Sequence, residues 1–343
     1  MTPYQDDIHL AAQASLPWSR FKHCKILIAG ASGLIGSCLT EILLESASVN
    51  DLDLHIYAMG RDEQKTRARF AEYNCLPFFH ILEQDVTQPL ESTSCFDYII
   101  HAASSASPQL YQNKPVEVMK ANFIGVSNLL EYGIAHKMKR FLYLSSGEVY
   151  GDQQAEKLHE TLYGNVDILN PRSCYPSSKR AAETLAICYA REYGADIVIA
   201  RPCHTFGPFF QDSDQRAYAQ FIRNAEAGKG IILKSDGSHY RSWCYVVDCA
   251  TALLTILLKG HSGQAYNIAD KNCETSMRIL AETIARLGNV SLQVGQPDAS
   301  SGQRVVFDTT LLEELGWKTE GTLADKLTHT LSTRKMKADE KEH

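Results

Sequence analysis

A glycine-rich turn near the start of the chain constrains the fold more than any other feature. The segment "CKILIAG" (24–30) is a short apolar run ended by glycine, and "ASGLIGSCLTEILLESA" follows with apolar residues at helical spacing. Bare backbone between a strand and a helix permits a tight turn, close approach of a pyrophosphate to the helix N-terminus, and close packing of helix on strand. This context predicts a dinucleotide site at Gly30, Ser32, Gly33, Leu34, Ile35 and Gly36.

The same alternation of strand and helix continues along the chain. Apolar runs such as "LHIYAMG", "FDYIIHAAS", "RFLYLSSGEVYG" and "ADIVIARP" are separated by helical segments. This pattern predicts an α/β fold, a Rossmann-type doubly wound parallel sheet with helices on both faces. After Pro202 the elements are shorter, which indicates a smaller C-terminal substrate-binding lobe. We therefore expect an N-terminal extension (1–23), an NAD(P)-binding Rossmann domain (24–202), a lobe partly interleaved with it (203–332), and a frayed polar tail (333–343).

Charge and cysteine usage narrow the function classes. The 343 residues carry a net charge of −6, which opposes a broad nucleic-acid or membrane-surface footprint but permits a local basic pocket. The sequence has no signal peptide and no apolar stretch of transmembrane length, so we expect a cytoplasmic protein without nucleic-acid or membrane partners. The ten cysteines are irregularly spaced, and we expect them to be reduced, with no metal site.

The choice of dinucleotide depends on the segment after the second expected strand. That segment reads "YAMGRDEQ", where Gly60 leaves space and Arg61 could pair with the 2′-phosphate of NADP. Equally, Arg61 could be a solvated loop cation beside Asp62, with Asp62 capping the next helix. We expect Asp85 and Val86, at the end of the third strand, to meet the adenine ring. The fourth strand ends in "HAAS" (101–104), where Ala102 and Ala103 would pass the cofactor.

The segment "NPRSCYPSSKRAAE" (170–183) contains the strongest candidate for chemistry. Tyr175 and Lys179 are four residues apart, so on a helix they share one face within about 6 Å. A tyrosine pKa of about 10 could then move towards neutrality beside a cation and a nicotinium ring. Ser146, at the end of the preceding strand, would reach the same carboxyl edge of the sheet and hydrogen-bond a substrate hydroxyl. The three residues predict proton abstraction coupled to hydride transfer.

With these motifs in place, the chain resembles the extended short-chain dehydrogenase/reductases over roughly residues 24 to 330. The resemblance to nucleotide-sugar epimerases, dehydratases and decarboxylases rests on "GASGLIG", "LSSGEVYG", "YPSSK", "RPCHTFGP" and "GSHYRSWCYVVDCATAL". Within this group, "HAASSASP", "YGNVDILNPRSCYPSSKRAAET" and "FGPFFQDSDQRAYAQFI" look most similar to UDP-glucuronate decarboxylases.

The resemblance implies roles for several residues. With NAD as the cofactor, Tyr175 would take the proton of the sugar 4-hydroxyl while hydride leaves C4, Lys179 would support it, and Glu148 would act near C5. The chain departs from the family at Gly147, where decarboxylases usually carry Ser and 4,6-dehydratases Asp. His204 replaces the usual Asn, and Lys234 a common aromatic residue, which weakens the expectation of uridine recognition.

The resemblance also implies a substrate pocket and a dimer. The substrate would be a nucleotide-diphosphate sugar, whose two phosphates attract cations. Arg241 matches the diphosphate-contacting arginine of the family, Arg216 another substrate-side arginine, and Ser104 and Arg172 are further candidates. His101, His204 and the cysteines we expect to be structural. Two helices, 116–137 and 175–193, pair across a two-fold axis in the family, which implies a homodimer, although the chain itself could cover them.

Two classes of function follow. The first is an enzyme that oxidises a sugar nucleotide transiently at C4, with decarboxylation favoured over 4,6-dehydration, 4-epimerisation or NADPH-dependent reduction of a 4-ketosugar. Gly60 and Arg61 favour the reductase. The second class is a dinucleotide sensor without catalysis. Such a protein would typically lose Tyr175 or Lys179, and both are present.

Overall fold

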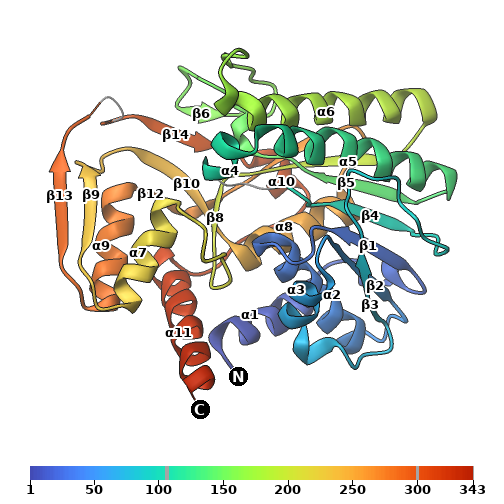
Figure 1. Cartoon of the computed structure of the whole chain (residues 1–343), viewed down its shortest axis with the longest axis horizontal. Coiled ribbons are helices and arrows are strands. Elements are labelled where there is room, and N and C mark those ends of the chain that lie inside the picture. Colours follow the sequence, from blue (N-terminus) through green and yellow to red (C-terminus); the bar gives the residue numbers. More distant parts are fainter. Residues whose placement is uncertain (105–107, 299–300, 343) are drawn as a thin grey trace.

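A seven-stranded parallel sheet forms the centre of the molecule (Figure 1). The computed structural model describes residues 1–104, 108–298 and 301–342. The strand order is β11-β7-β5-β4-β1-β2-β3, and every neighbouring pair is parallel. The predicted α/β fold with a Rossmann-type sheet is therefore confirmed. The strands are β1 (Lys25–Ala29), β2 (His55–Gly60), β3 (Phe79–Glu83), β4 (Tyr98–His101), β5 (Arg140–Leu144), β7 (Ile197–Pro202) and β11 (Ala265–Ile268).

Both faces of this sheet are buried, as its apolar strands require. In β1, Ile26 and Ile28 belong to one hydrophobic core, while Leu27 and Ala29 belong to the core on the opposite face. The first core lies under α2 (Leu34–Val49) and α8 (Val246–Lys259). The second lies under α5 (Pro115–Ala135) and α6 (Cys174–Tyr193), which run side by side over the sheet in Figure 1.

The strand order places a crevice at the carboxyl edge of the sheet. From β1 the chain moves outward to β2 and β3, then returns to β4 on the other side of β1. Ligands of open α/β sheets bind at this switch point, outside the carboxyl ends of the strands. The turn after β1, α3 (Glu63–Arg69) after β2, and α4 (Pro108–Asn113) after β4 all begin at this edge.

The second half of the chain forms a smaller lobe that is interleaved with the Rossmann sheet. Its strand β11 completes the large sheet, whereas β6, from the first half, joins the sheet of the lobe. The lobe consists of β8 (His204–Phe206), β10 (Tyr240–Tyr245), β12 (Asp270–Ser276) and β14 (Arg304–Phe307) with β6 (Lys157–Leu158), the pair β9 (Ile231–Ser235) and β13 (Leu292–Gln296), and helices α7 (Ala217–Glu226), α9 (Met277–Gly288) and α10 (Thr310–Glu314).

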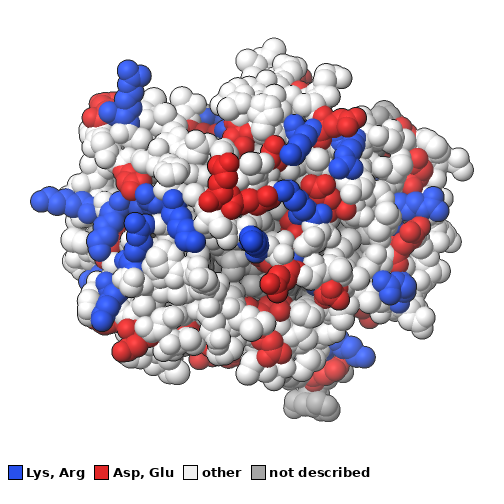
Figure 2. All heavy atoms as spheres, turned by 180° about the vertical axis from the view of Figure 1, so that it is seen from behind, with Lys and Arg blue, Asp and Glu red and all other residues white. Residues whose placement is uncertain are grey.

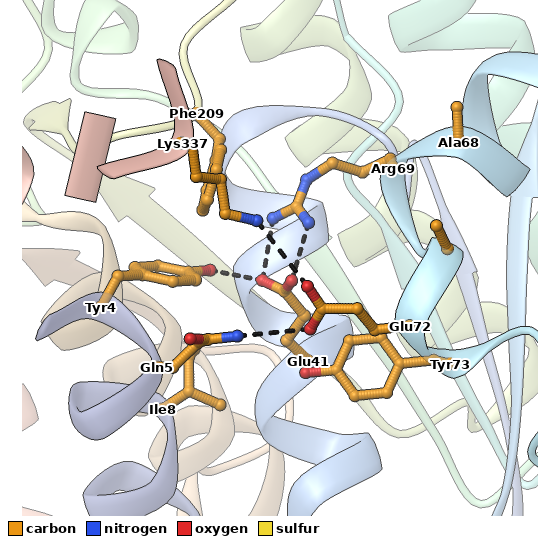
Figure 3. A pocket seen from close by; sticks show the side chains of 11 residues that line it. Tyr4, Gln5, Ile8, Glu41, Ala68, Arg69, Glu72, Tyr73, Phe209 and Lys337 are labelled. Carbon is orange, nitrogen blue, oxygen red and sulfur yellow. Dashed lines mark hydrogen bonds and ion pairs between the residues drawn. The ribbon is translucent and has the colours of Figure 1, made fainter. Parts of the chain in front are cut away.

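The N-terminal extension contains a helix that packs against the rest of the protein. Helix α1 (Pro3–Ala12) starts with a capping box between Thr2 and Gln5, and it packs on α2. Figure 3 shows the pocket beside it, where the Tyr4 hydroxyl donates to the Glu41 carboxylate at 2.5 Å. Arg69 from α3 binds the same carboxylate through both terminal nitrogens, at 2.7 and 2.8 Å. These bonds satisfy the buried Glu41, so the polar groups of this pocket hold three helices together.

The expectation of a frayed tail over 333–343 is wrong. Helix α11 (Leu323–Glu342) includes residues 333–342. Thr330 and Thr333 are fully buried, and the Tyr4 backbone N–H donates to the Thr333 hydroxyl at 3.2 Å. Arg334 forms an ion pair with Glu226 of α7. A polar composition suggested disorder, but contacts with α1 and α7 at distant places in the sequence order the helix.

Charges of both signs are distributed over the surface. Figure 2 shows basic and acidic side chains on the same face rather than one sign covering it. No helix among the described residues is long and apolar enough to cross a membrane. All ten cysteines are free thiols. Among the residues that the structure describes, no group of three or more His, Cys, Asp or Glu side chains could hold a metal ion.

Candidate active site

The glycine turn forms a bare cradle between β1 and α2. Gly30 has φ of +84°, and a Cβ there would lie 2.6 Å from the backbone of Ala102 and Ala103 at the end of β4. A Cβ on Gly36 would overlap the Gly30 carbonyl oxygen. Gly33 is the N-cap of α2 and has no side chain, so no N-cap side chain binds the first N–H groups of this helix. The cradle therefore fits the pyrophosphate of a dinucleotide.

The ends of β2 and β3 lie beside this cradle. A Cβ on Gly60 would come within 3.9 Å of the Ser32 hydroxyl, which places the end of β2 next to the turn. Arg61 is exposed, and its guanidinium has no hydrogen-bond or ion-pair partner among the described residues. Asp62 caps α3 by accepting from the Lys65 N–H at 2.8 Å. The capping expected for Asp62 is thus present, and Arg61 stays available for a ligand.

Asp85 and Val86 follow β3, the strand next to β2 at the edge of the sheet. The Asp85 carboxylate accepts from the Thr87 N–H at 2.9 Å, while Val86 is buried. A Cβ on Gly125 of α5 would lie 2.9 Å from a Val86 methyl group, so α5 packs closely on this segment. The contact of Asp85 and Val86 with adenine stays a prediction.

Tyr175 lies buried in the first turn of α6 and faces the serines at the ends of β4 and β5. Burial raises its pKa to about 12, opposed by hydrogen bonding from the Ser146 hydroxyl and, more weakly, from Ser104. The Ser104 Oγ is buried without a partner at full hydrogen-bond distance among the described residues. Ser104, Ser146 and Tyr175 are therefore gathered at one point of the sheet edge, as the sequence predicts.

Lys179 is held beside Tyr175 by the sheet itself. Its Nζ donates to the Leu144 carbonyl oxygen at 2.6 Å and lies 5.7 Å from the centroid of the Tyr175 ring. The ammonium also lies 4.8 Å from the Tyr143 ring, an attractive cation–π arrangement. Burial lowers the Lys179 pKa to about 7, and Glu183, one turn further along α6, opposes this shift. The side chain is 1% exposed, so the neighbours fix its position.

The expected depression of the tyrosine pKa does not occur in the chain alone. Burial dominates the pKa of Tyr175, and the nearby Glu148 carboxylate raises it further. Spacing on a helix predicted the proximity of Tyr175 and Lys179 correctly. It could not predict that both groups would be withdrawn from water, which disfavours phenolate and ammonium alike.

Glu148 and Arg172 form a bidentate ion pair near the buried Tyr175. Both guanidinium nitrogens donate to the carboxylate at 3.2 Å. Glu148 lies in the turn that follows β5, where Ser146 caps it by accepting from the Glu148 N–H at 3.2 Å. Arg172 precedes α6. The pair thus connects the two segments that carry Ser146 and Tyr175.

The two predicted substrate arginines differ in their partners. Arg216 binds the Asp214 carboxylate at 2.6 Å and donates to the Tyr218 hydroxyl. Arg241 has no carboxylate partner: it binds His204 Nε2 at 3.2 Å and His239 Nδ1 at 3.0 Å, and its buried Nε has no partner among the described residues. Burial lowers the pKa of Arg241. Arg241 and Arg216 also lower the pKa of His204, so both cations lie near this imidazole, which fits an anionic ligand.

The sequence did not single out three residues that shape this site. Tyr111 of α4 stacks on Tyr175, with ring centroids 4.8 Å apart and the planes 21° apart, and the Arg172 guanidinium lies 4.6 Å from the Tyr111 ring. Glu183 acts on Lys179. Phe307 of β14 fills the space beside Gly147. Only Glu183, four residues after Lys179, could have been found from spacing.

A dinucleotide cradle at the start of a parallel sheet, with serine, tyrosine and lysine at its carboxyl edge, defines an enzyme of the short-chain dehydrogenase/reductase class. The NAD dependent epimerase/dehydratase family matches residues 26–269, and the chain belongs to this family. The predicted family, of the extended type, is thus confirmed, with NAD as its cofactor.

Comparisons with individual proteins agree with this membership. UDP-glucuronic acid decarboxylases 5 and 3 of Arabidopsis thaliana are each 35% identical over 308 residues, which cover 88% of this chain and 87% and 86% of theirs. The crystal structure of DesIV, a dTDP-glucose 4,6-dehydratase of Streptomyces venezuelae with NAD and TYD bound, superimposes with a TM-score of 0.79 at 22% identity, over 92% of this chain and 98% of that one. The structural match confirms the fold.

Proposed function

We propose that the protein is a nucleotide-sugar decarboxylase, which converts UDP-glucuronate to UDP-xylose through transient oxidation at C4. The observation that carries the proposal is the 35% identity to UDP-glucuronic acid decarboxylases over nearly the whole of both chains. The geometry supports it because Tyr175, Ser146 and Glu148 converge at the sheet edge.

The first task of the site is to take a proton from the sugar 4-hydroxyl. In our proposal Tyr175 accepts that proton, and Ser146 and Ser104 orient the hydroxyl, since these groups surround the phenol. NAD, when bound, supplies reversible acceptance of hydride from C4. Lys179 is held next to the Tyr175 ring by the Leu144 carbonyl, where its charge stabilises the phenolate that forms. A bound nicotinium would add to this effect.

The second task is the loss of carbon dioxide from C5. Once C4 is a ketone, the C5 carboxylate belongs to a β-keto acid. The C5–C6 bond breaks, its electron pair moves to the ketone oxygen as an enolate, and C5 then takes a proton. We assign Glu148 to this end of the sugar. Its bidentate pair with Arg172 holds the carboxylate in place. Gly147 puts neither the aspartate of the 4,6-dehydratases nor the serine of the decarboxylases between Ser146 and Glu148, so Glu148 is the acidic group that this turn offers to C5.

We assign the diphosphate of the substrate to Arg241, with Arg216 nearby. Arg241 lies in a largely desolvated position without an anionic partner among the described residues, so a phosphate would supply the missing charge. Arg216 is neutralised by Asp214, which makes it a weaker candidate.

The stoichiometry of the reaction tests the proposal. The protein is incubated with UDP-glucuronate and a catalytic amount of NAD, and products are identified by mass spectrometry while absorbance follows the reduced cofactor. We expect UDP-xylose and carbon dioxide with no net accumulation of reduced cofactor. A dehydrated product, or UDP-galacturonate, would instead identify a dehydratase or an epimerase.

A second candidate function is an NADPH-dependent 4-ketosugar reductase. The observation that favours it is the exposed guanidinium of Arg61, which follows β2 directly and has no partner among the described residues, so it could bind a 2′-phosphate. Consumption of NADPH in equal amount to product would establish this function. A sensor without catalysis is disfavoured because Tyr175 and Lys179 are both present and adjacent.

We further propose a homodimer formed through α5 and α6, acting in the cytoplasm. Three apolar residues on one side of α5, Val116, Met119 and Phe123, are exposed to 64%, 45% and 42%. Such a row is typical of a protein interface. The free thiols agree with a reducing compartment.

A further inference from the structure

Gly147 stands at a position where the structure leaves no room for a side chain. A Cβ built there would overlap the Cζ atom of Phe307 and lie 2.8 Å from its Cε2. Real Cβ contacts are longer than 3.0 Å, so the ring would have to move. Gly147 follows Ser146 directly and precedes Glu148. The ring of Phe307 therefore occupies the space that a side chain between these two residues would otherwise fill.

Phe307 is fixed in this place from three directions. Its backbone N–H donates to the Ser242 hydroxyl at 2.9 Å, and Ser242 follows Arg241 directly. Its ring meets Tyr150 edge to face, with centroids 5.7 Å apart and planes at 88°. Its strand β14 pairs with β10 and with β6, where Phe307 stands opposite Leu158. Phe307 thus connects two parts of the site: its ring lies beside the loop that carries Ser146 and Glu148, and its backbone binds the strand that carries Arg241.

We propose that Phe307 is a specificity-determining residue, whose ring forms the apolar wall at the C5 end of the sugar in place of a side chain at position 147. The proposal rests on the decarboxylase function proposed above. Phe307 is 8% exposed, and its ring offers neither a proton donor nor a hydrogen bond. Elimination of water would need a proton donor for the leaving hydroxyl. The ring of Phe307 excludes such a donor from position 147.

The same wall favours loss of a carboxylate. A carboxylate against an aromatic ring loses part of its hydration, and an ionised group in an apolar environment is destabilised. Departure as neutral carbon dioxide relieves that cost and moves the charge to the ketone oxygen at C4. A substrate without a C5 carboxylate gains nothing from the wall. Phe307 should therefore affect UDP-glucuronate much more than UDP-xylose.

The test replaces the ring and compares these two ligands. In Phe307→Ala we expect kcat for UDP-glucuronate to fall about ten-fold or more, while the Kd of UDP-xylose stays within about two-fold of the wild type. Phe307→Leu keeps an apolar wall and should lose less. The matched control is Leu158→Ala, which removes a buried neighbour from the same small core without touching position 147.

A reciprocal variant tests the pairing itself. Gly147→Ser alone should lose activity and thermal stability, because its Cβ meets the Phe307 ring. Adding Phe307→Ala should restore much of the stability, and the double variant should form detectable amounts of a product other than UDP-xylose. If the effects of Gly147→Ser and Phe307→Ala on thermal stability simply add in the double variant, the two positions are not coupled and the proposed pairing is wrong.

The outcomes separate this inference from the proposed function. If wild type decarboxylates UDP-glucuronate and Phe307→Ala weakens both ligands as Leu158→Ala does, Phe307 is structural and the inference is wrong. If wild type binds UDP-glucuronate without decarboxylating it, the proposed function fails. In that case the role of Phe307 is decided by binding alone, from the ratio of the Kd of UDP-glucuronate to the Kd of UDP-xylose in Phe307→Ala. Should that variant not fold, the same ratio in Phe307→Leu decides.

Discussion

The ammonium of Lys179 is anchored on the Leu144 carbonyl oxygen at 2.6 Å, and it lies 5.7 Å from the ring centroid of Tyr175. Leu144 ends β5 and directly precedes the serines of the catalytic turn. The last carbonyl of a central strand therefore sets the distance between the cation and the phenol. Because both groups are buried, neither is ionised as readily as in water, and the ionised form of Tyr175 depends on what the site binds.

Replacing the phenol tests the central role of Tyr175. In Tyr175→Phe we expect kcat to fall by about 10²- to 10⁴-fold, because the proton acceptor is gone while the ring still stacks on Tyr111. The Kd of NAD, measured by titration calorimetry, should stay within about two-fold. Tyr163→Phe, at a tyrosine that is 73% exposed, is the matched control. Unchanged turnover would remove Tyr175 from the mechanism.

Arg241 should dominate binding of the diphosphate. Its guanidinium is largely desolvated and has only histidine partners among the described residues, so Arg241→Ala should weaken UDP binding by about ten- to a hundred-fold. Calorimetry with UDP measures this effect without turnover. Arg278→Ala, at an exposed arginine paired with Glu282 on α9, should leave the affinity unchanged. An equal loss in both variants would indicate a general effect of charge.

Arg61 should discriminate between the two dinucleotides rather than support both. Its side chain is exposed and makes no contact that the fold needs, so Arg61→Ala should fold normally. We expect NADP affinity to fall about ten-fold and NAD affinity to change by less than about two-fold, because only NADP carries the 2′-phosphate. Fluorescence titration with both cofactors measures the ratio. An equal loss for both cofactors would place Arg61 elsewhere on the ligand.

The local parts of the site could be predicted from the sequence. The glycines of the turn and the pair Tyr175 and Lys179 lie close together in the chain, and strand or helix geometry fixes their neighbours. The parallel sheet followed from the alternation of elements. Ser146 followed from its position at the end of a predicted strand, whereas Arg241 could be placed only because its motif resembles that of a known family.

The remaining features depend on contacts between distant segments. Phe307 meets Gly147 across 160 positions of the chain, since β14 returns to the sheet edge beside the catalytic turn. Stacking of Tyr111 on Tyr175 brings α4 over α6, and burial raises the pKa of the tyrosine in the chain without cofactor. The order of the C-terminal helix likewise results from its contacts with α1 and α7. No local spacing encodes such contacts.

His101 should make the protein less stable as the pH falls. It is fully buried at the end of β4, and burial, with a smaller effect of Lys179, lowers its pKa from 6.5 to about 3. Between these values the unfolded chain binds a proton that the folded chain does not, so the free energy of unfolding falls as the pH drops from 6.5 towards 3. At pH 5 the loss is about 2 kcal/mol relative to neutral pH.

Denaturant unfolding at pH 7 and pH 5 measures this linkage. His101→Gln removes the titrating group and keeps a donor for the Ala121 carbonyl. The difference in the free energy of unfolding between pH 7 and pH 5 should therefore shrink by about 2 kcal/mol. His261→Gln, at an exposed histidine, is the control and should keep the wild-type difference. A pH dependence that is the same in His101→Gln and in wild type would assign it to other groups.

The apolar row on α5 should hold two copies of the chain together. Phe123 is 42% exposed in the single chain, with Met119 one turn away on the same side, so a glutamate at this position would bury a charge in the proposed interface. We expect Phe123→Glu to be monomeric by light scattering coupled to size exclusion, where wild type is a dimer. Leu10→Glu changes an equally apolar residue, 67% exposed on α1, and should leave the dimer intact. A wild-type monomer would contradict the proposed dimer. A dimer that persists in Phe123→Glu would place its interface elsewhere, because a charge buried within a true apolar interface prevents association.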